Sequence, residues 1–180
     1  GWQRSCPWVA TGLPWIPPSP NIPTVHAAYC YASTGILQAT TVSEGRGTCK
    51  PFEYFGAPFI DGDELVQCLN TYELPGVLWR EVHFRPAFNK YSGKNCHGAH
   101  LVISDADCFQ PLLTTCALLQ ALARLYERDF RLEQGFSDWL DGGVWTEAAL
   151  RQLDLNTFCC NANAAGALFE KRIRPYSLYN

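Results

Sequence analysis

The hexapeptide SEGRGT at residues 43–48 is the centre of a polar and aromatic stretch, residues 11–58, around which we expect the chain to fold. Glycines stand on both sides of its arginine, Arg46, and glycine permits backbone angles that let a polar loop turn tightly and direct its side chains to one point. The flanking segments 14–23 (PWIPPSPNIP) and 51–58 (PFEYFGAP) contain several prolines, which fix φ and lack an N–H donor, so we expect rigid loops there. Rigid loops with polar side chains often form binding sites, and we expect the functional site in this stretch.

Length, composition and charge indicate one folded domain. The chain has 180 residues, of which 47% are hydrophobic, and a formal net charge of −3, which is typical of a globular domain rather than a disordered chain. It has no run of basic residues, and no apolar run approaches the roughly 18 residues that a membrane helix needs. We therefore expect neither nucleic acid nor a membrane as a partner.

The chain contains no methionine and no N-terminal signal pattern, and we therefore expect it to be a fragment of a longer protein. It has nine cysteines, an odd number, so at least one of them cannot pair within the chain. No CxxC motif and no repeated cysteine spacing is present, and the cysteines do not define a redox compartment.

Hydrophobic periodicity predicts a mixture of helices and strands. Alternating and β-rich residues predict strands at 77–84 and 99–104, with weaker strand character at 36–42 and an aromatic turn at 51–58. Helical spacing predicts helices at 63–70, 111–127, 146–153 and 164–172, the first capped by Asp61 or Asp63 and the third by Thr146. Because no regular strand–helix alternation appears, we predict an α+β fold: a single compact domain with a small mixed sheet, packed helices and long proline-rich loops.

No metal or cofactor site is expected. Cys96, His97 and His100 resemble a metal-binding cluster, but no second pair of ligands follows at a suitable spacing, so a structural role is favoured. Motifs for a nucleophilic serine, a phosphate loop, a zinc protease or a dinucleotide fold are missing from the sequence.

Glu44 is the candidate catalytic carboxylate. A glycine loop could expose it beside Arg46, and a nearby arginine favours the ionised form of a carboxylate, which suits a base, a nucleophile or an acceptor for a hydroxyl group. The alternative, equally supported by the residue types, is a structural Glu44–Arg46 pair that braces the loop. The hydroxyl groups of Ser43 and Thr48 add to a polar and aromatic pocket of the kind that suits a sugar.

Three further residues offer polar contacts. Ser19 and Asn21, framed by prolines, could present fixed hydrogen bonds to a ligand or could stabilise a turn. Glu53 is a possible second carboxylate, although a solvated position in a turn is favoured.

Several motifs together resemble the bacterial exo-β-N-acetylmuramidase family. They are TGLPWIPPSPNIPT at residues 11–24, SEGRGT at 43–48, PFE at 51–53, GAP at 56–58, FRPxFxKYxG at 84–93, CxG at 96–98 and RPYxLY at 174–179. The motifs occur in the family's order and cover nearly the whole chain, and the two long motifs are highly specific.

The resemblance implies half of a two-domain glycoside hydrolase that removes N-acetylmuramic acid from the non-reducing ends of peptidoglycan fragments. In that family a Rossmann-like domain precedes an α+β domain, and the active-site cleft lies between them. Residues 1–10 would then lead in from a missing Rossmann-like domain, and residues 11–180 would form the second domain. The partners would be that domain and a muropeptide or other amino-sugar glycan, the location would be periplasmic or secreted, and no cofactor would be needed. The isolated chain would be inactive, since the family's proposed catalytic glutamate lies in the first domain.

The resemblance also implies roles for the candidate residues. Glu44 would act as a second carboxylate in glycoside hydrolysis or would hold a sugar hydroxyl group. The expected substrate-binding residues on this side of the cleft are Ser19, Asn21, Ser43, Arg46 and Thr48.

The chain departs from the family pattern at positions near the site. Gln38 stands where the family usually carries a glutamate, and Thr41 lies near the place of an asparagine. Cys30 and Cys49 are also unusual for the family. The alternative reading is therefore a non-catalytic homologue that serves as a structural, assembly or glycan-binding module.

Overall fold

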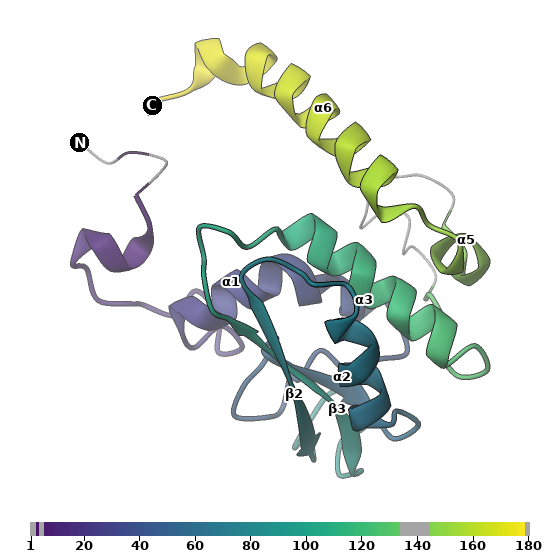
Figure 1. The fold of residues 1–180 in the computed structure, drawn as a ribbon. Helices are drawn as coiled ribbons and strands as arrows, with labels where there is room; N and C mark the ends of the chain where they lie inside the picture. Colours follow the sequence, from purple (N-terminus) through teal and green to yellow (C-terminus); the bar gives the residue numbers. More distant parts are fainter. Residues whose placement is uncertain (1–2, 4–5, 134–144, 179–180) are drawn as a thin grey trace.

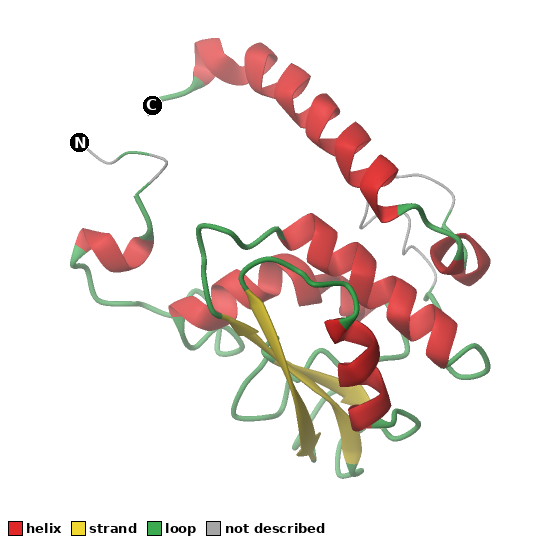
Figure 2. Ribbon diagram, in the orientation of Figure 1, coloured by secondary structure: helices red, strands yellow, loops and turns green. Residues whose placement is uncertain are grey.

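The computed structural model of the chain describes residue 3, residues 6–133 and residues 145–178. It is an α+β fold in which a small sheet is packed against helices (Figures 1 and 2), so the predicted class is confirmed. Residues 1–2 and 4–5 of the expected lead-in segment, and Tyr179 at the end of the last motif, lie outside the described residues. None of the described helices combines the length and apolarity that a bilayer span requires.

The sheet has three strands in the order β1 (Tyr54–Ala57), β3 (Cys96–Ile103) and β2 (Val77–Phe84). Both pairings are antiparallel, whereas the sequence led us to expect a mixed sheet. A hairpin can join β2 directly to β3, because antiparallel neighbours need no crossover. The strand at 77–84 forms as predicted, β3 begins three residues earlier than predicted, and β1 occupies the segment expected to be an aromatic turn.

Residues 25–39 are helical, so the prediction of weak strand character at 36–42 is wrong. Helix α1 spans Val25–Thr34 and continues into a 3₁₀ turn, Gly35–Ala39. The Thr24 side chain caps α1 by accepting a hydrogen bond from the Ala27 N–H at 3.0 Å. Cys30 and Leu37 are completely buried, and this tertiary packing outweighs the local strand preference.

The other predicted helices are present, with shifted ends. Helix α2 is Gly62–Asn70, α3 is Pro111–Leu125, α5 is Glu147–Arg151 and α6 is Leu155–Ile173. The expected caps form: Asp61 accepts from the Glu64 N–H and Thr146 accepts from the Ala149 N–H. Helix α6 begins nine residues earlier than predicted because the Asp154 side chain caps it at the Thr157 N–H.

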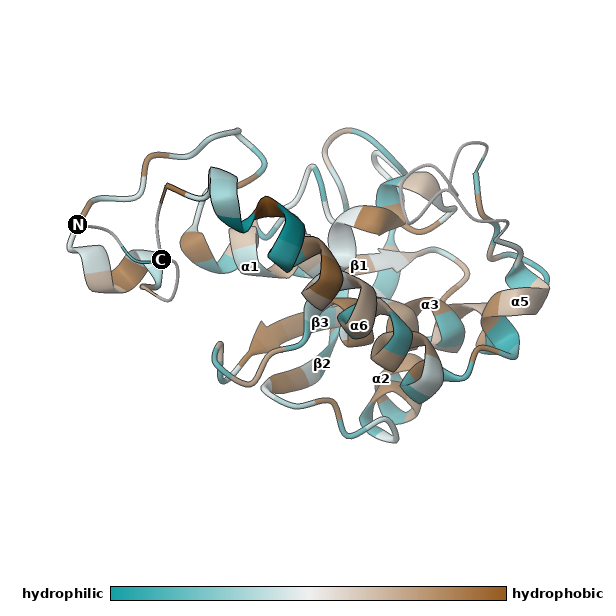
Figure 3. Ribbon diagram, turned by 90° about the horizontal axis from the view of Figure 1, so that it is seen from above, coloured by the Kyte–Doolittle hydropathy of each residue, from teal (hydrophilic) through white to brown (hydrophobic). Residues whose placement is uncertain are grey.

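The helices enclose the core unequally. Helix α3 is buried along most of its length and contacts α1, α2, α5 and α6, while α2 packs on β2 and β3. Helix α6 extends away from this body (Figure 1), and none of its residues is buried. Its Leu168 and Phe169 are exposed, and Figure 3 shows hydrophobic and hydrophilic segments of ribbon along this helix.

Gln120 is a buried polar residue in the middle of α3. Its side-chain N–H₂ group donates to the backbone carbonyls of Leu150 at 3.1 Å and Leu153 at 2.7 Å. Its side-chain oxygen accepts from the Tyr72 hydroxyl at 3.1 Å, so one amide joins α3 to α5 and to the end of α2.

We expect Gln120→Leu to lower the free energy of unfolding by about 2 kcal/mol or more, because it leaves buried polar groups without partners. Gln67→Leu, on the exposed face of α2, is the control and should change stability little. Urea denaturation of both variants measures the difference. Equal effects of the two substitutions would show that the Gln120 amide does not join the helices.

Candidate functional site

The SEGRGT loop is fixed by backbone hydrogen bonds on both sides. Ser43 and Gly56 exchange two backbone hydrogen bonds of 2.9 and 3.0 Å, and the Phe52 N–H donates to the Glu44 carbonyl at 2.8 Å. Gly45 and Gly47 have φ angles of +78° and +81°, which favour glycine. A Cβ atom at Gly47 would lie 2.5 Å from the carbonyl oxygen of Phe88, so the loop also needs glycine to approach the β2–β3 connection.

Glu44 lies at the bottom of this loop with only 1% of its side chain exposed. Its Oε1 atom accepts a hydrogen bond of 3.0 Å from the side-chain amide of Asn89 and lies 3.3 Å from an Arg46 guanidinium nitrogen. The ammonium of Lys90 lies 3.9 Å from the other oxygen, Oε2. The loop therefore buries the Glu44 carboxylate between two cations instead of exposing it, contrary to the expectation from its glycines.

Lys90 joins this centre to the chain that follows α1. Its ammonium donates to the backbone carbonyls of Leu37 and Gln38, both at 2.9 Å, and also to that of Thr40. Burial lowers the pKa of Lys90, while the charges of Glu44 and Glu133 act in the opposite direction. The hydrogen-bond donors of Lys90 are thus used on the backbone, which leaves it as a charge beside Glu44 rather than as a hydrogen-bond partner.

Two buried polar atoms of the centre lack a hydrogen-bond partner among the described residues: Oε2 of Glu44 and Nε of Arg46. The Arg46 guanidinium also lies over the Phe52 ring, 5.3 Å from its centroid. An unpaired acceptor and an unpaired donor on adjacent side chains can together bind a group that both accepts and donates, such as a hydroxyl group or water.

The hydroxyl groups of Ser43 and Thr48 are used inside the loop. Ser43 Oγ accepts from the Gly45 N–H at 3.2 Å, and Thr48 Oγ1 donates to the Gly45 carbonyl at 2.6 Å. Ser19 Oγ accepts from the Asn21 N–H at 3.2 Å, which is the turn-stabilising alternative. Within the described ranges, no hydrogen bond or ion pair connects Ser19 or Asn21 to Glu44.

Glu53 is buried with 3% of its side chain exposed, so the expectation of a solvated turn is wrong. Its Oε2 atom lies 2.5 Å from the Lys50 ammonium, 3.4 Å from Nε2 of His100 and 4.0 Å from Nε2 of His26. Burial raises the pKa of Glu53, but the hydrogen bonds from His100 and Lys50 outweigh burial and hold the pKa below its usual value. The turn before β1 directs this carboxylate inward, against α1 and β3.

Asn89 and Lys90 are contacts of Glu44 that the sequence did not identify. They lie in FRPxFxKYxG, a motif noted for its resemblance to the family, but Asn89 is 45 residues after Glu44 and Lys90 follows it, and local spacing cannot predict contacts over such a separation. The resemblance of this motif to the family was the available signal for a position near the site.

The residues that resembled a metal cluster do not converge. His97 pairs with His83 across the sheet, with their Nδ1 atoms 2.7 Å apart, while His100 contacts Glu53. In the part of the chain that the structure describes, no group of three or more His, Cys, Asp or Glu residues could hold a metal ion.

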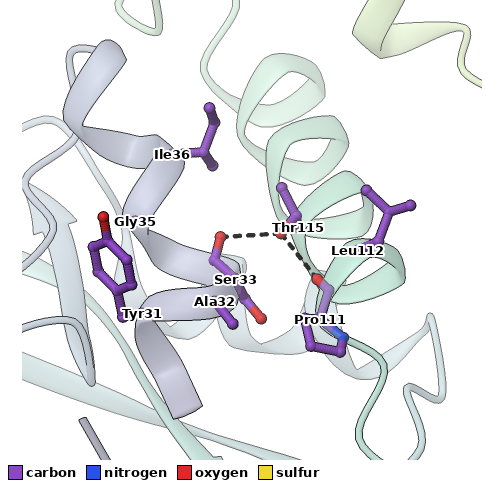
Figure 4. A pocket seen from close by; sticks show the side chains of 8 residues that line it. All are labelled: Tyr31, Ala32, Ser33, Gly35, Ile36, Pro111, Leu112 and Thr115. Atoms are coloured by element: carbon purple, nitrogen blue, oxygen red, sulfur yellow. Dashed lines mark hydrogen bonds between the residues drawn. The ribbon is translucent and has the colours of Figure 1, made fainter. Parts of the chain in front are cut away.

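A cavity of about 360 Å³ lies between α1 and α3, and Glu44 is not among the residues that line it. Figure 4 shows the side chains that line it, including Tyr31, Ile36 and Leu112, with Ser33 and Thr115 between the two helices. The Thr115 hydroxyl donates to the carbonyls of Ser33 at 3.0 Å and Pro111 at 2.9 Å, so the polar groups there join the two helices.

We expect Gly47→Ala to destabilise the protein by about 2 kcal/mol more than Gly93→Ala. Both glycines have positive φ, at +81° and +73°, but a Cβ at Gly93 meets no atom within 4 Å. Gly93→Ala therefore measures the cost of a positive φ alone, and the difference between the two variants measures the cost of the clash with Phe88. Thermal or urea denaturation compares them, and equal losses would contradict a close approach of the two loops.

Acid should weaken the fold through Glu53. Because its pKa is lower in the folded state, its stabilising contribution is present above the unfolded value, about 4.3, and is lost as the pH falls through the folded pKa. We expect Glu53→Gln to be less stable than the parent near neutral pH and to lose less stability on acidification. Urea denaturation at a series of pH values, from neutral to below the unfolded pKa, measures the free energy of unfolding of the parent and of Glu53→Gln, with the exposed Glu73→Gln as the control. Parallel curves of this free energy against pH for the parent and Glu53→Gln would contradict the prediction.

Comparison with known proteins identifies the family. The family model for the C-terminal part of the exo-β-N-acetylmuramidase NamZ matches residues 29–179. The chain is 43% identical over 145 residues to the peptidoglycan β-N-acetylmuramidase NamZ of Bacillus subtilis (strain 168), an alignment that covers 80% of this chain and 35% of the relative. The chain thus spans about a third of the length of this curated relative.

Two crystal structures of DUF1343 family proteins from Bacteroides fragilis NCTC 9343 are also similar. One is 34% identical, with a TM-score of 0.67, and the match covers 71% of this chain and 33% of that protein. The other is 23% identical, with a TM-score of 0.68 and coverage of 92% and 44%, and supports the fold alone. Together with the residues of the SEGRGT loop and the α+β fold, these matches show that the chain belongs to the NamZ exo-β-N-acetylmuramidase family and corresponds to its C-terminal part.

Proposed function

We propose that this chain forms one side of the active-site cleft of an enzyme that removes N-acetylmuramic acid from the non-reducing ends of peptidoglycan fragments. Family membership supports a glycosidase-related role, because the curated relative is a peptidoglycan β-N-acetylmuramidase. The observation that carries the proposal is the buried Glu44 carboxylate, whose Oε2 atom lacks a hydrogen-bond partner among the described residues.

A sugar hydroxyl group fits the chemistry of this centre. It can donate to Oε2 of Glu44 and accept from Nε of Arg46, the two unpaired atoms. Burial strengthens the effect of such a bond on binding, because a buried polar atom without a hydrogen bond carries a desolvation cost that the ligand would remove. Since Glu44 is 1% exposed, the sugar would reach it only if the loop around Arg46 moves outward.

The catalytic role of Glu44 follows from its charge. Glycoside hydrolysis uses one carboxyl group to protonate the leaving oxygen and a second to assist at the anomeric carbon, where positive charge develops. Glu44, placed between Arg46 and Lys90, is proposed as the second group.

The protonating acid would come from a preceding Rossmann-like domain, to which residues 1–10 would lead. Ser19, Asn21, Ser43, Arg46 and Thr48 are proposed to contact the glycan when the cleft is complete, and the enzyme would work in the periplasm or outside the cell.

A second candidate is a glycan-binding module without catalysis. Gln38 and Thr41 are the positions that depart from the family pattern, and the side chains of both donate hydrogen bonds to backbone carbonyls. The Gln38 side chain donates to the Gly35 carbonyl at 2.9 Å, and Thr41 Oγ1 donates to the Asp129 carbonyl at 2.9 Å. Both side chains therefore stabilise the fold instead of serving the reaction, which favours a chain that binds glycan without cleaving it.

A chimera tests the catalytic proposal. This chain would replace the matching segment of the Bacillus subtilis relative, and release of the chromophore from a chromogenic N-acetylmuramic acid glycoside would be followed. We expect the chimera to be active and the isolated chain inactive. Glu44→Gln in the chimera should lower kcat by about 100-fold or more, because it removes the charge that assists at the anomeric carbon.

The controls separate catalysis from folding. Glu170→Gln, an exposed position on α6, should leave the rate unchanged. Because Glu44 compensates two partly buried cations, its replacement also costs stability, so circular dichroism must show that the Glu44→Gln chimera is folded at the assay temperature. Normal kcat in a folded Glu44→Gln chimera would make Glu44 a structural partner of Arg46. An inactive parent chimera that still binds the sugar would favour the glycan-binding module.

A further inference from the structure

A second polar centre lies on the sheet, outside the SEGRGT loop. Tyr54 of β1 is paired with His100 of β3, and His100 is paired with Arg80 of β2. Residues directly opposite one another in neighbouring strands share a face of the sheet, so these three side chains form one row across all three strands. The Tyr54 ring meets the His100 ring edge to face at 4.9 Å.

This row opens into a cavity of about 410 Å³ whose wall includes Lys50, Tyr54, Arg80 and His100. The volume falls within the range of about 300–1,000 Å³ that is typical of small-molecule sites. Lys50 and His100 are also the two residues whose side chains form hydrogen bonds with Oε2 of Glu53. The buried carboxylate thus fixes the positions of two side chains of the cavity wall.

Hydrogen-bond donors dominate this wall. The Lys50 ammonium uses one N–H on Glu53 and has two more to offer. The Arg80 guanidinium is exposed and forms no hydrogen bond or ion pair within the described part of the chain. Glu81 also lines the cavity, and its Oε1 atom lies 3.4 Å from Nε2 of His83. Lys50 is paired with Glu53, whereas Arg80 forms no ion pair in the described part of the chain.

We infer that this cavity binds the carboxylate of an acidic amino sugar and that Arg80 recognises its negative charge. An arginine fork matches a carboxylate in geometry as well as in charge, since two parallel N–H donors meet its two oxygens. Lys50 supplies a further donor, and the Tyr54 ring supplies an apolar wall for the sugar. The inference rests on the proposed function for the choice of a sugar. It adds a specificity site that is separate from Glu44.

Two monosaccharides provide the test, because N-acetylmuramic acid is N-acetylglucosamine with a carboxylate-bearing ether substituent. Binding of each to the chain would be measured by NMR titration. We expect the parent to bind N-acetylmuramic acid more tightly. Arg80→Gln should weaken that binding about ten-fold or more, because a hydrogen bond to a charged group is lost, and should leave binding of N-acetylglucosamine unchanged.

Matched variants make the test specific. Arg80→Lys keeps the positive charge but lacks the two parallel N–H donors of a guanidinium, so it should retain part of the preference for N-acetylmuramic acid over N-acetylglucosamine. Arg172→Gln removes an exposed arginine on α6 and should have no effect. Because Arg80 is exposed and lacks a described partner, its substitution should leave the NMR spectrum of the free chain nearly unchanged, which checks the fold.

The results separate this inference from the proposed function. Equal affinities of the parent for the two sugars, or an Arg80→Gln variant that loses both equally, would overturn the carboxylate site while leaving the role of Glu44 in the chimera intact. Failure of the chain to bind either sugar would overturn the inference. Loss of the preference in Arg80→Gln together with unchanged turnover in a Glu44→Gln chimera would support the carboxylate site and refute the catalytic assignment.

Discussion

The burial of one charge, the Glu44 carboxylate, constrains much of this structure. A carboxylate with 1% exposure is costly unless cations and hydrogen-bond donors surround it. Arg46 comes from the same loop, whereas Asn89 and Lys90 come from the connection between β2 and β3. Lys90 in turn binds the backbone of residues 37–42, so the charge holds three distant segments together. The two glycines of the loop allow that approach, because a side chain at Gly47 would strike the backbone of Phe88.

The same stretch of sequence places two carboxylates in different surroundings. Glu44 is compensated by Arg46 from its own loop and by Asn89 and Lys90 from across the fold, and one of its oxygens has no described hydrogen-bond partner. Glu53 is compensated by Lys50, three residues earlier, and by His100 on β3, and its pKa is lowered by them against the effect of burial. The described contacts of Glu53 with Lys50, His100 and His26 all involve its Oε2 atom, so this second carboxylate orients these neighbours.

Sequence reasoning succeeded where a local signal agrees with the tertiary structure. The strand at 77–84, the helix beginning at Pro111 and the caps at Asp61 and Thr146 all follow from periodicity or from a single hydrogen bond. It failed at 36–42, where burial of Leu37 and the carbonyl contacts of Lys90 decide the backbone. It also failed at Glu53, because the residue types of a turn do not reveal that His100, 47 positions later, will cover it.

The candidate site shows the same division between local and distant information. The composition of SEGRGT was enough to select Glu44 and Arg46, but not to show that the loop encloses the carboxylate. A buried acceptor and a buried donor without described partners, side by side on Glu44 and Arg46, are unfavourable in an isolated fold. Such a pair is retained at little cost when a ligand or water completes it, and under the proposed function the hydroxyl group of a sugar would complete it.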